Sequence, residues 1–556
     1  MKSDQVYLLL ITGELAEATE FISSRYPKCE CIVLSKHEFR VSGFRSQIQI
    51  FRKLEGKALV FFVRSLSALQ DPLLTAWSGV FHRCRSTVVA DSTGRFAEYT
   101  AWGRLRLVPQ TAASALLDLI VFAAAWPLIQ LLRMNSSRTP LQRPDEPDLD
   151  LAYLYPYPLD MALAGGAHSH VKGFLSGVAS SGASGEIFSG RLLPPQKFPQ
   201  HVVPAKRRCF LFRESLMLSY NLRFALAVRK LLRGRRVGAL YQRHGRFVVA
   251  GILLSRWLDL PLILEFNGSE MWVAKYWDPA RFGRWLKACE EASLCGAHLV
   301  VVVSDALKQE LLQRGIPETR ILVNPNAVDP VIFYPGCGRE EVRGRLNIAD
   351  TDIVVAFVGT FDRWHGTLVL QQAIEMLLQE QQQDVGTKRL KFLLIGEGPL
   401  SLDMRRALQG HAGDRVLFTG LVPHTQVPAY LDAADILVSP HISMPDGRPF
   451  FGSPTKLFEY MAMAKAIIAS NLDQLSRVLQ HGRSAWLVEP GSVSELASAV
   501  ILLANNPGLR DQLGQSARSS ALAEHTWQQN AERVLAAICP AVRHGTVTAA
   551  TGAKMA

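Results

Sequence analysis

The composition describes a large globular protein with an excess of positive charge. The 556 residues are 48% hydrophobic and 20% charged, enough for about three or four domains with sizeable cores. The formal net charge of +12 favours an anionic partner, but dispersed basic residues and the lack of an aromatic–basic reading motif argue against nucleic acid. The eight cysteines form no CxxC pair and no signal-peptide cleavage region follows the first apolar run, so we expect a cytoplasmic protein.

Residues 1–108 are predicted to form an extra small α/β domain. Apolar, β-rich runs occur at residues 6–11, 58–63 and 86–91, and a helical pattern lies between the first two. Alternation of strands and helices indicates a parallel sheet. We find no catalytic constellation in this part of the chain.

Residues 109–150 are predicted to be an apolar helix followed by a linker. The stretch 111–132 is long enough to span a bilayer, but it contains Asp118 and Pro127. Arginines on both sides leave the positive-inside signal undecided. A spanning helix, a helix lying on the membrane and a buried helix all remain open. The polar residues 135–150 are typical of a linker.

Residues 151–335 carry the pattern of a doubly wound α/β unit. Segment 151–177 is predicted to be a strand, a Gly-rich loop and a helix, whereas 177–200 is expected to be irregular. Ligands of such sheets bind at the carboxyl ends of strands, which predicts an acceptor-side crevice, with local turn chemistry as the alternative for each residue. The candidate residues of this crevice are Gly165, Gly166, His168, Arg243, His244, Glu265 and Asn267.

A second doubly wound unit is predicted over residues 336–525. A helix within 526–542 is expected to return to the first unit, and 543–556 to form a disordered tail. Within this unit, 450–470 is predicted to be a loop, a helix and a buried strand, with Ser453 as N-cap and Pro454 at the first helical position. Lys456 and Glu459 share one face of that helix, where a phosphate and a sugar hydroxyl pair could bind; an ordinary helix with a surface ion pair is the alternative.

Five segments in order resemble glycosyltransferase family 4, the retaining enzymes of the GT-B fold. They are VNPNAVDP (323–330), FVGTFDRWHG (357–366), FLLIGEGP (392–399), AADILVSP (433–440) and the run 453–470. The resemblance covers residues 151–540. It implies two Rossmann-like domains facing a cleft, with a UDP- or GDP-type nucleotide sugar held mainly by the second domain. It implies no cofactor, and we find no Asp-x-Asp pair for a metal.

The resemblance assigns roles to individual residues. Glu459 matches the glutamate that binds the donor ribose, 359–366 matches the diphosphate loop, and 396–398 matches the turn facing the nucleotide. The implied donor-binding residues are Gly359, Thr360, Arg363, Gly366, Gly396, Gly398, Ser453, Lys456, Leu457 and Glu459. The proposed catalytic residues are Lys456, His365 and His244.

The chain departs from the family pattern at several positions. Thr360 and His365 stand where the family has Arg and Lys, and Phe451 stands where it has a glutamate that touches the donor sugar. The usual Gly-Lys-Pro after the helix is Ala-Lys-Ala at 464–466. Lys456 is therefore the first candidate for the contact with the phosphate, and His365 and Arg363 are the next candidates. Asp446 or Arg448 is the candidate for the missing sugar contact.

The predicted function is transfer of a hexosyl unit, with retention, from a nucleotide sugar to a glycan or lipid-linked acceptor in surface polysaccharide or glycoconjugate synthesis. Two alternatives remain: another sugar-nucleotide activity of this fold, such as an epimerase, and a non-catalytic scaffold of a glycan-assembly complex. The apolar helix at 111–132 suggests work at the inner face of the plasma membrane.

Overall fold

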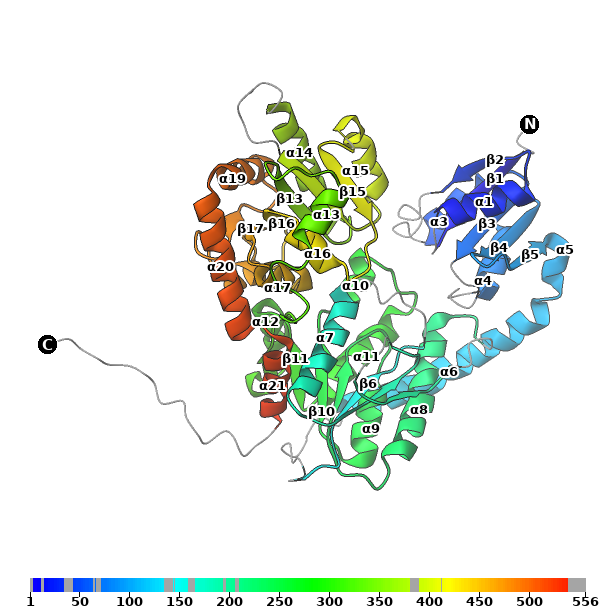
Figure 1. Cartoon of the computed structure of the whole chain (residues 1–556). Helices are drawn as coiled ribbons and strands as arrows, with labels where there is room; N and C mark the ends of the chain where they lie inside the picture. Colours follow the sequence, from blue (N-terminus) through cyan, green and yellow to red (C-terminus); the bar gives the residue numbers. More distant parts are fainter. Residues whose placement is uncertain are drawn as a thin grey trace.

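The computed structural model contains three β-sheets joined along one chain (Figure 1). It describes residues 4–11, 15–34, 44–63, 66, 72–134, 144, 146–158, 166–193, 197–205, 210–380, 390–411 and 413–538. The expected disordered tail at 543–556 and the candidate Gly165 lie outside these residues.

The N-terminal sheet has the order β2-β1-β3-β4-β5. Its strands are β1 (Gln5–Leu10), β2 (Glu30–Val33), β3 (Ala58–Val63), β4 (Ser86–Asp91) and β5 (Phe96–Thr100). Helices α1 (Leu15–Arg25), α3 (Phe44–Arg52) and α4 (Pro72–Trp77) connect the parallel strands. β5 runs antiparallel to β4, so the edge of the sheet departs from the all-parallel expectation. The reason is that residues 92–95 form a tight turn around Asp91, whose carboxylate accepts backbone N–H groups from Thr93 and Arg95.

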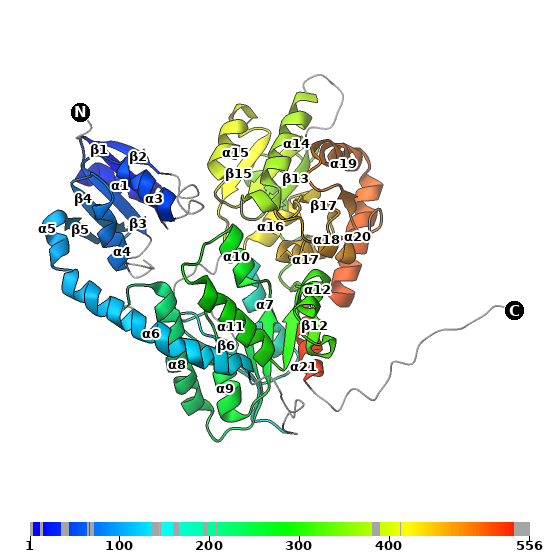
Figure 2. The same cartoon turned by 180° about the vertical axis from the view of Figure 1, so that it is seen from behind.

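A single long helix, α6 (Val108–Met134), connects this domain to the rest of the chain. It follows the short helix α5 (Ala101–Leu105) and runs along the outside of the next domain in both views (Figures 1 and 2). Phe122 packs on Phe282 at 4.2 Å between ring centroids and on Trp285 at 5.3 Å. Arg133 pairs with Glu291 at 2.7 Å. The helix therefore belongs to the packed structure along one of its sides.

The second sheet is wholly parallel, with the order β12-β11-β10-β9-β6-β7-β8. Its strands are β6 (Leu149–Tyr155), β7 (Gly185–Ser189), β8 (Gln200–Val202), β9 (Val237–Arg243), β10 (Leu262–Phe266), β11 (Leu299–Val302) and β12 (Ile321–Val323). Its helices are α7 (Gly166–Ser180), α8 (Arg213–Leu232), α9 (Ala250–Leu258), α10 (Glu270–Tyr276), α11 (Gly283–Gly296) and α12 (Asp305–Gln313). The expectation of an irregular 177–200 segment is wrong at β7, where Ile187 and Phe188 are fully buried between neighbouring strands.

The third sheet is also parallel, with the order β15-β14-β13-β16-β17-β18. Its strands are β13 (Ile353–Val358), β14 (Leu390–Ile395), β15 (Val416–Gly420), β16 (Ile436–Ser439), β17 (Ala466–Ser470) and β18 (Trp486–Val488). Its main helices are α13 (Arg339–Arg345), α14 (Thr367–Glu380), α15 (Ser401–Ala407), α16 (Val427–Asp432), α17 (Thr455–Ala462), α18 (Asp473–Val478), α19 (Val493–Asn505) and α20 (Pro507–Glu524).

Strand order reverses once in each of the two larger sheets. The chain adds β7 and β8 on one side of β6 and then returns with β9 on the other; it does the same around β13 with β14 and β16. Ligands of doubly wound sheets bind beyond the carboxyl ends of the strands at such a reversal. The loops after β6 and β13 are therefore the two places where a ligand site is expected.

The last described helix, α21 (Trp527–Ala537), packs on α7 of the second sheet's domain. Gly173 and Gly177 make room for it, since a Cβ atom at Gly173 would stand 2.1 Å from the Trp527 ring. A Cβ at Gly177 would meet the Trp527 carbonyl oxygen at 2.0 Å. Glycine is thus required at both positions for this close helix contact.

We expect Trp527→Ala to lower the free energy of unfolding by about 3 kcal/mol or more, because it leaves a cavity between α21 and α7. The control is Trp102→Ala, since that side chain is 82% exposed and its loss should cost less than about 0.5 kcal/mol. Urea denaturation of both variants measures the difference. Equal losses would contradict the assigned packing.

Candidate donor-binding cleft

Two glycine-containing loops interlock at the carboxyl end of β13. Gly359 (φ +147°) donates its backbone N–H to Ile395 at 3.0 Å, and a Cβ at Gly396 would stand 2.1 Å from the Gly359 carbonyl oxygen. A Cβ at Gly398 would lie 2.5 Å from backbone atoms of Phe361. Gly366 has φ +71°, and its Cβ would collide with the Pro440 carbonyl oxygen. The four candidate glycines therefore permit close backbone approach around one site.

Lys456 of α17 points its amino group into this loop region. Its Nζ would stand 3.2 Å from a Cβ atom built on Gly359 and lies 4.2 Å from the Phe357 ring centroid. The side chain is only 8% exposed, and Nζ has no hydrogen-bond partner among the described residues. Burial lowers the pKa of Lys456 to about 7, and the carboxylate of Glu459 only partly offsets this. A buried amine without a bonded counter-ion is suited to receive an anion.

Two histidines beside Lys456 are neutral at physiological pH. Burial and the nearby Lys456 lower the pKa of His365 to about 3 and that of His441 well below its usual range. The two rings meet edge to face, 5.3 Å apart between centroids. His365 Nδ1 lies 2.7 Å from the Thr360 carbonyl oxygen, which fixes the proton on Nδ1. Burial and the neighbouring Lys456 therefore disfavour a positive charge on His365 in the ligand-free protein, and its contact with a phosphate stays a prediction.

Glu459 lies one turn after Lys456 and is 7% exposed. Its Oε1 is 3.4 Å from Nε2 of His424, and the same nitrogen is 3.0 Å from Ser169 Oγ on α7. The carboxylate thus faces the space between the second and third sheets. An ionised carboxylate there can accept two hydrogen bonds from a vicinal hydroxyl pair.

The start of α17 differs from the prediction. The helix begins at Thr455 with Pro454 as N-cap, and Ser453 caps nothing. Instead, Ser453 Oγ accepts the Asn326 backbone N–H at 3.0 Å, which ties the loop to the domain of the second sheet. Leu457 is also corrected as a donor-binding residue: its side chain is in the core and its N–H is bonded to the Pro454 carbonyl.

A buried ionic cluster lies at the carboxyl ends of β9 and β10. Glu265 is 2.6 Å from Arg243 and 3.0 Å from His170, and it also accepts hydrogen bonds from Tyr241 and Asn267. Burial opposes ionisation of this carboxyl, but His170 and Arg243 outweigh it and lower the pKa of Glu265 to about 2. The sequence-predicted Arg243, Glu265 and Asn267 are thus brought together.

This cluster continues to the beginning of α17. His170 Nδ1 is 2.6 Å from Asn326 Oδ1, and Asn326 donates its side-chain amide to the Ser453 carbonyl oxygen. Thr455 in turn bonds the Gly166 carbonyl oxygen at 3.4 Å. Gly166 is the first residue of α7, so the α7 N-terminus abuts the start of α17, the helix that carries Lys456. His168 follows in the first turn; burial and then His424 lower its pKa.

His244 occupies a separate buried network. Its Nε2 is 3.3 Å from Glu290, which also pairs with Arg314 at 2.9 Å and accepts the Ser269 hydroxyl at 2.8 Å. The His244 ring rests on Phe266, 5.0 Å between centroids. Within the described part of the chain, no contact joins His244 to Lys456 or Glu459. The catalytic assignment of His244 therefore has no geometric support, because the ring is held by structural partners.

Phe451, one of the departures from the family pattern, lies in the loop 441–454, which contacts the neighbouring domain. The Phe451 ring packs on Trp272 at 5.2 Å between ring centroids, and the Phe451 carbonyl oxygen accepts a hydrogen bond from the Ser304 hydroxyl. Asp446 accepts the Trp272 indole N–H at 3.0 Å and pairs with Arg448 at 2.7 Å. Asp446 and Arg448 are thus engaged in interdomain contacts instead of pointing freely at a sugar.

Two loop candidates are open to solvent. Thr360 and Arg363 both have exposed side chains. The loop keeps its shape through other groups, since Thr367 Oγ1 donates to the Asp362 carbonyl oxygen at 2.9 Å. Lys456 is consequently the buried cation of this loop region.

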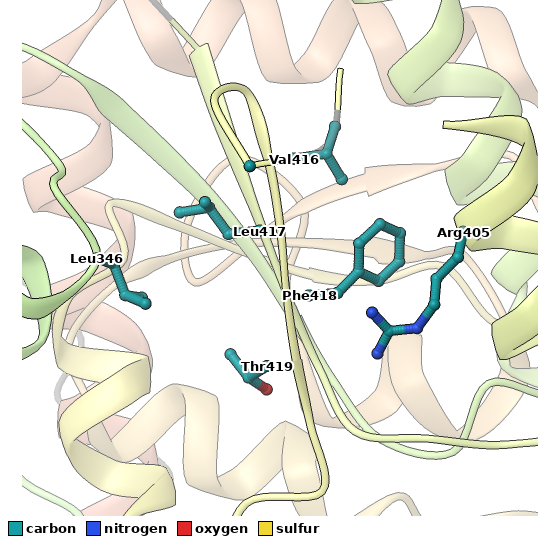
Figure 3. A pocket seen from close by; sticks show the side chains of 7 residues that line it. Leu346, Arg405, Val416, Leu417, Phe418 and Thr419 are labelled. Atoms are coloured by element: carbon teal, nitrogen blue, oxygen red, sulfur yellow. The ribbon is translucent and has the colours of Figure 1, made fainter. Parts of the chain in front are cut away.

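A cavity of about 240 Å³ lies beside β15 (Figure 3). Its lining residues are Leu346, Arg405, Gly413, Val416, Leu417, Phe418 and Thr419. Arg405 lies 4.6 Å from the Phe418 ring centroid and pairs with Glu397 of the turn at 2.7 Å. The cavity contains none of the predicted site residues, so it is a neighbour of the cleft and not the cleft itself.

Sequence reasoning missed several residues of the site. His441 follows β16, His424 follows β15, and Asn326 precedes the second domain, each without a local pattern of its own. The position of each directly beyond a strand's carboxyl end is the signal that could have found them.

Two successive parallel, doubly wound sheets, with Lys456 and Glu459 facing the first from the second, are the architecture of a GT-B glycosyltransferase. Crystal structures of a glycosyltransferase from Rickettsia africae and of Anabaena HepE in complex with UDP superpose with TM-scores of 0.54 each, at 16% identity. They cover 72% and 69% of this chain and 100% and 98% of their own.

Two family models match successive parts of the chain: "Glycosyltransferase Family 4" over residues 164–331 and "Glycosyl transferases group 1" over 352–506. The chain belongs to this glycosyltransferase family. Among its relatives, the α-D-kanosaminyltransferase of Streptomyces kanamyceticus is 23% identical over 55% of this chain and 78% of its own length. The putative teichuronic acid biosynthesis glycosyltransferase TuaC of Bacillus subtilis is 26% identical over 46% of this chain and 59% of its own.

Proposed function

We propose that this protein transfers a hexosyl unit, with retention, from a UDP- or GDP-type nucleotide sugar to a glycan or lipid-linked acceptor. The observation that carries the proposal is the buried, unbonded amino group of Lys456 facing Gly359 at the carboxyl end of β13. Relatives named for teichuronic acid and amylovoran biosynthesis support a polysaccharide or glycoconjugate product. The UDP bound by HepE supports a UDP-type donor. We place the reaction in the cytoplasm.

Different residues of the site bind different parts of the donor. The glycines of the loops 359–366 and 396–398 let the diphosphate approach the backbone closely, and the Lys456 amino group neutralises part of the diphosphate charge. Glu459 accepts the ribose hydroxyls. When the glycosyl–phosphate bond breaks, negative charge grows on the departing diphosphate, so a preorganised cation is most useful there. Because His365 and His441 are neutral in the ligand-free protein, Lys456 is the side chain that we assign to stabilising the negative charge on the diphosphate.

Retention in a single displacement, without a protein nucleophile, requires the acceptor to approach from the face on which the diphosphate leaves. The acceptor oxygen forms a bond to the anomeric carbon as the bond from that carbon to the phosphate oxygen breaks. The acceptor proton passes to the departing diphosphate oxygen, so no protein nucleophile is needed. On the side of the second sheet, Gly166 and His168 at the α7 N-terminus are the groups we assign to positioning the acceptor. We expect the reaction to proceed without a metal.

The test is a panel of nucleotide sugars scored by thermal shift, followed by turnover with candidate acceptors. A bound donor should raise the melting temperature through mass action. Release of nucleoside diphosphate that depends on acceptor supports the transferase. Conversion of the donor sugar without acceptor would instead identify an epimerase, and binding without turnover across the panel would identify a scaffold.

We expect Glu459→Gln to weaken nucleotide-sugar binding by about 10-fold or more, because a charge-assisted pair of hydrogen bonds to the ribose is lost. The measurement is calorimetric titration with the donor found in the panel. Glu495→Gln on the exposed start of α19 is the matched control. A deoxyribose donor should lose affinity for the native protein but not for the variant; equal losses would contradict the ribose contact.

A further inference from the structure

One side of α6 is fixed to the domain of the second sheet. Asp118 is 2% exposed and accepts the backbone N–H groups of Leu211 and Phe212 at 3.1 and 3.0 Å. The Ser215 hydroxyl donates to the same carboxylate at 2.5 Å. At the other end, Arg256 donates to the Leu132 carbonyl oxygen at 2.7 Å. A helix fixed to a globular domain near its middle and at its C-terminal end cannot thread through a bilayer without breaking these contacts.

The opposite side of α6 is apolar and uncovered. Between Arg106 and Arg133 the sequence contains one charged residue, Asp118, and that residue is buried. α6 is long and apolar enough to span a membrane, yet only 22% of its most apolar window is buried in the protein. The exposed large apolar side chains of this face are Val108, Leu116, Leu119, Ile120, Leu128, Leu131 and Met134, together with Trp126, which is 38% exposed and also packs on Trp285 at 5.2 Å between ring centroids.

The spacing of these side chains makes one continuous stripe. Leu116, Leu119 and Ile120 lie three and four residues apart, and Leu128, Leu131 and Met134 follow at intervals of three. The exposed Ala123, Ala124 and Pro127 continue this face between the two groups, while the buried residues Phe122, Ile129 and Leu132 face the protein. In the preceding short helix α5, Trp102 and Leu105 are also exposed, at 82% and 57%. An uninterrupted apolar face of this length is far larger than soluble monomers normally leave in water.

The neighbouring helix α8 adds positive charge beside the stripe. α6 packs against α8, and both views show the two helices adjacent on the outside of the domain (Figures 1 and 2). The exposed residues of α8 include Leu222 and Leu226 among cations, and its sole acidic residue, Glu214, is buried. The exposed cations on and just after this helix are Arg223, Arg229, Lys230 and Arg233.

We propose that the outward face of α6, continued by the exposed face of α8, seats the protein on an anionic membrane surface. The helix lies in the plane of the interface and does not span it. Leucine, isoleucine and tryptophan side chains enter the boundary of the acyl chains, and the α8 cations meet the lipid phosphates. The charge pattern selects this occupant, because a second copy would place the same cations against each other. Both family models leave α6 unmatched, whereas α8 lies within the matched residues 164–331, so α6 adds an apolar face beside the transferase core.

The test is flotation of the full chain with two vesicle types, pure phosphatidylcholine and phosphatidylcholine with about 30% phosphatidylglycerol. We expect binding to the anionic vesicles that weakens with salt. Leu119→Glu/Leu131→Glu should lower the partition coefficient at least about 10-fold. The matched control is Leu421→Glu/Val331→Glu, whose native side chains are 76% and 81% exposed elsewhere and whose substitution should leave partitioning unchanged.

A second variant separates charge from apolar insertion. Arg223→Gln/Arg229→Gln/Lys230→Gln should lower anionic-vesicle binding about 5-fold for each cation removed and leave neutral-vesicle binding unaltered. Thermal shift with the nucleotide sugar should be the same for all variants, which keeps this proposal separate from the transferase assignment. A concentration-dependent dimer that the α6 variant abolishes, without vesicle binding by the native chain, would overturn the proposal. So would equal partitioning of the α6 variant and its control.

Discussion

Lys456→Met should lower kcat/KM by at least about 100-fold, because it removes the buried cation that meets the charge growing on the leaving diphosphate. The same substitution should raise the stability of the ligand-free protein by about 2 kcal/mol or more, since an uncompensated buried amine is replaced by an apolar side chain of similar length. Loss of activity together with gain of stability is the signature of a site held ready for an anion. Steady-state kinetics and urea denaturation measure the two effects.

The matched control is Lys465→Met. Lys465 is also largely buried, but its Nζ donates to the Asp432 carbonyl oxygen at 2.8 Å and pairs with its carboxylate at 3.3 Å. Removing it leaves Asp432 without its cation, so the control should lose stability and keep donor affinity. If Lys456→Met kept full turnover, or lost stability as the control does, the phosphate role of Lys456 would be wrong.

The pH dependence of donor binding gives Lys456 a second readout. Burial places the pKa of the free amine at about 7, and a bound diphosphate must raise it. The contribution of the Lys456 charge to donor binding is then fully present below pH 7. It disappears as pH rises through the higher pKa that Lys456 has in the donor complex. Donor binding near pH 8 should therefore take up a proton, which calorimetry in buffers of different ionisation enthalpy detects. Lys456→Met should abolish this uptake.

The sequence predicted the parts of the site that depend on local pattern. Lys456 and Glu459 are three residues apart on one helix, so their shared face followed from helical geometry. The diphosphate-type loop at 359–366 was found because glycine is required wherever φ is positive or another backbone approaches closely. The GT-B fold followed from alternating strands and helices combined with the resemblance to family 4.

The residues that the sequence did not reveal depend on tertiary contacts. His365 was taken as a cation, but its charge is decided by burial beside Lys456 and His441, which no local pattern encodes. Serine is a residue type typical of an N-cap, but the Ser453 hydroxyl oxygen accepts the backbone N–H of Asn326, 127 residues earlier in the chain. Strand β7 is short and follows a Ser- and Gly-rich segment, so it was concealed by turn-forming neighbours.

Glu265→Ala should lower the free energy of unfolding by about 3–5 kcal/mol, because Arg243 would remain buried without its carboxylate. The carboxylate also fixes His170, which reaches Asn326 and through it the loop before α17. We therefore expect weaker donor binding along with lower stability, although Glu265 itself touches no donor group in our assignment. The pKa of Glu265 is lowered to about 2, so its stabilising effect should persist above pH 4.5 and vanish as pH falls toward 2.

A double-mutant cycle with Arg243→Met decides how this stability arises. Because each single change leaves one charge buried and unpaired, Glu265→Ala/Arg243→Met should be more stable than the sum of the Glu265→Ala and Arg243→Met losses predicts, by at least about 1.5 kcal/mol. Glu341→Ala, at a carboxylate 78% exposed, is the control and should cost less than about 0.5 kcal/mol. Additive losses in the cycle would mean that the cluster is held by packing, and the electrostatic link from Glu265 to the Lys456 loop would then have to be abandoned.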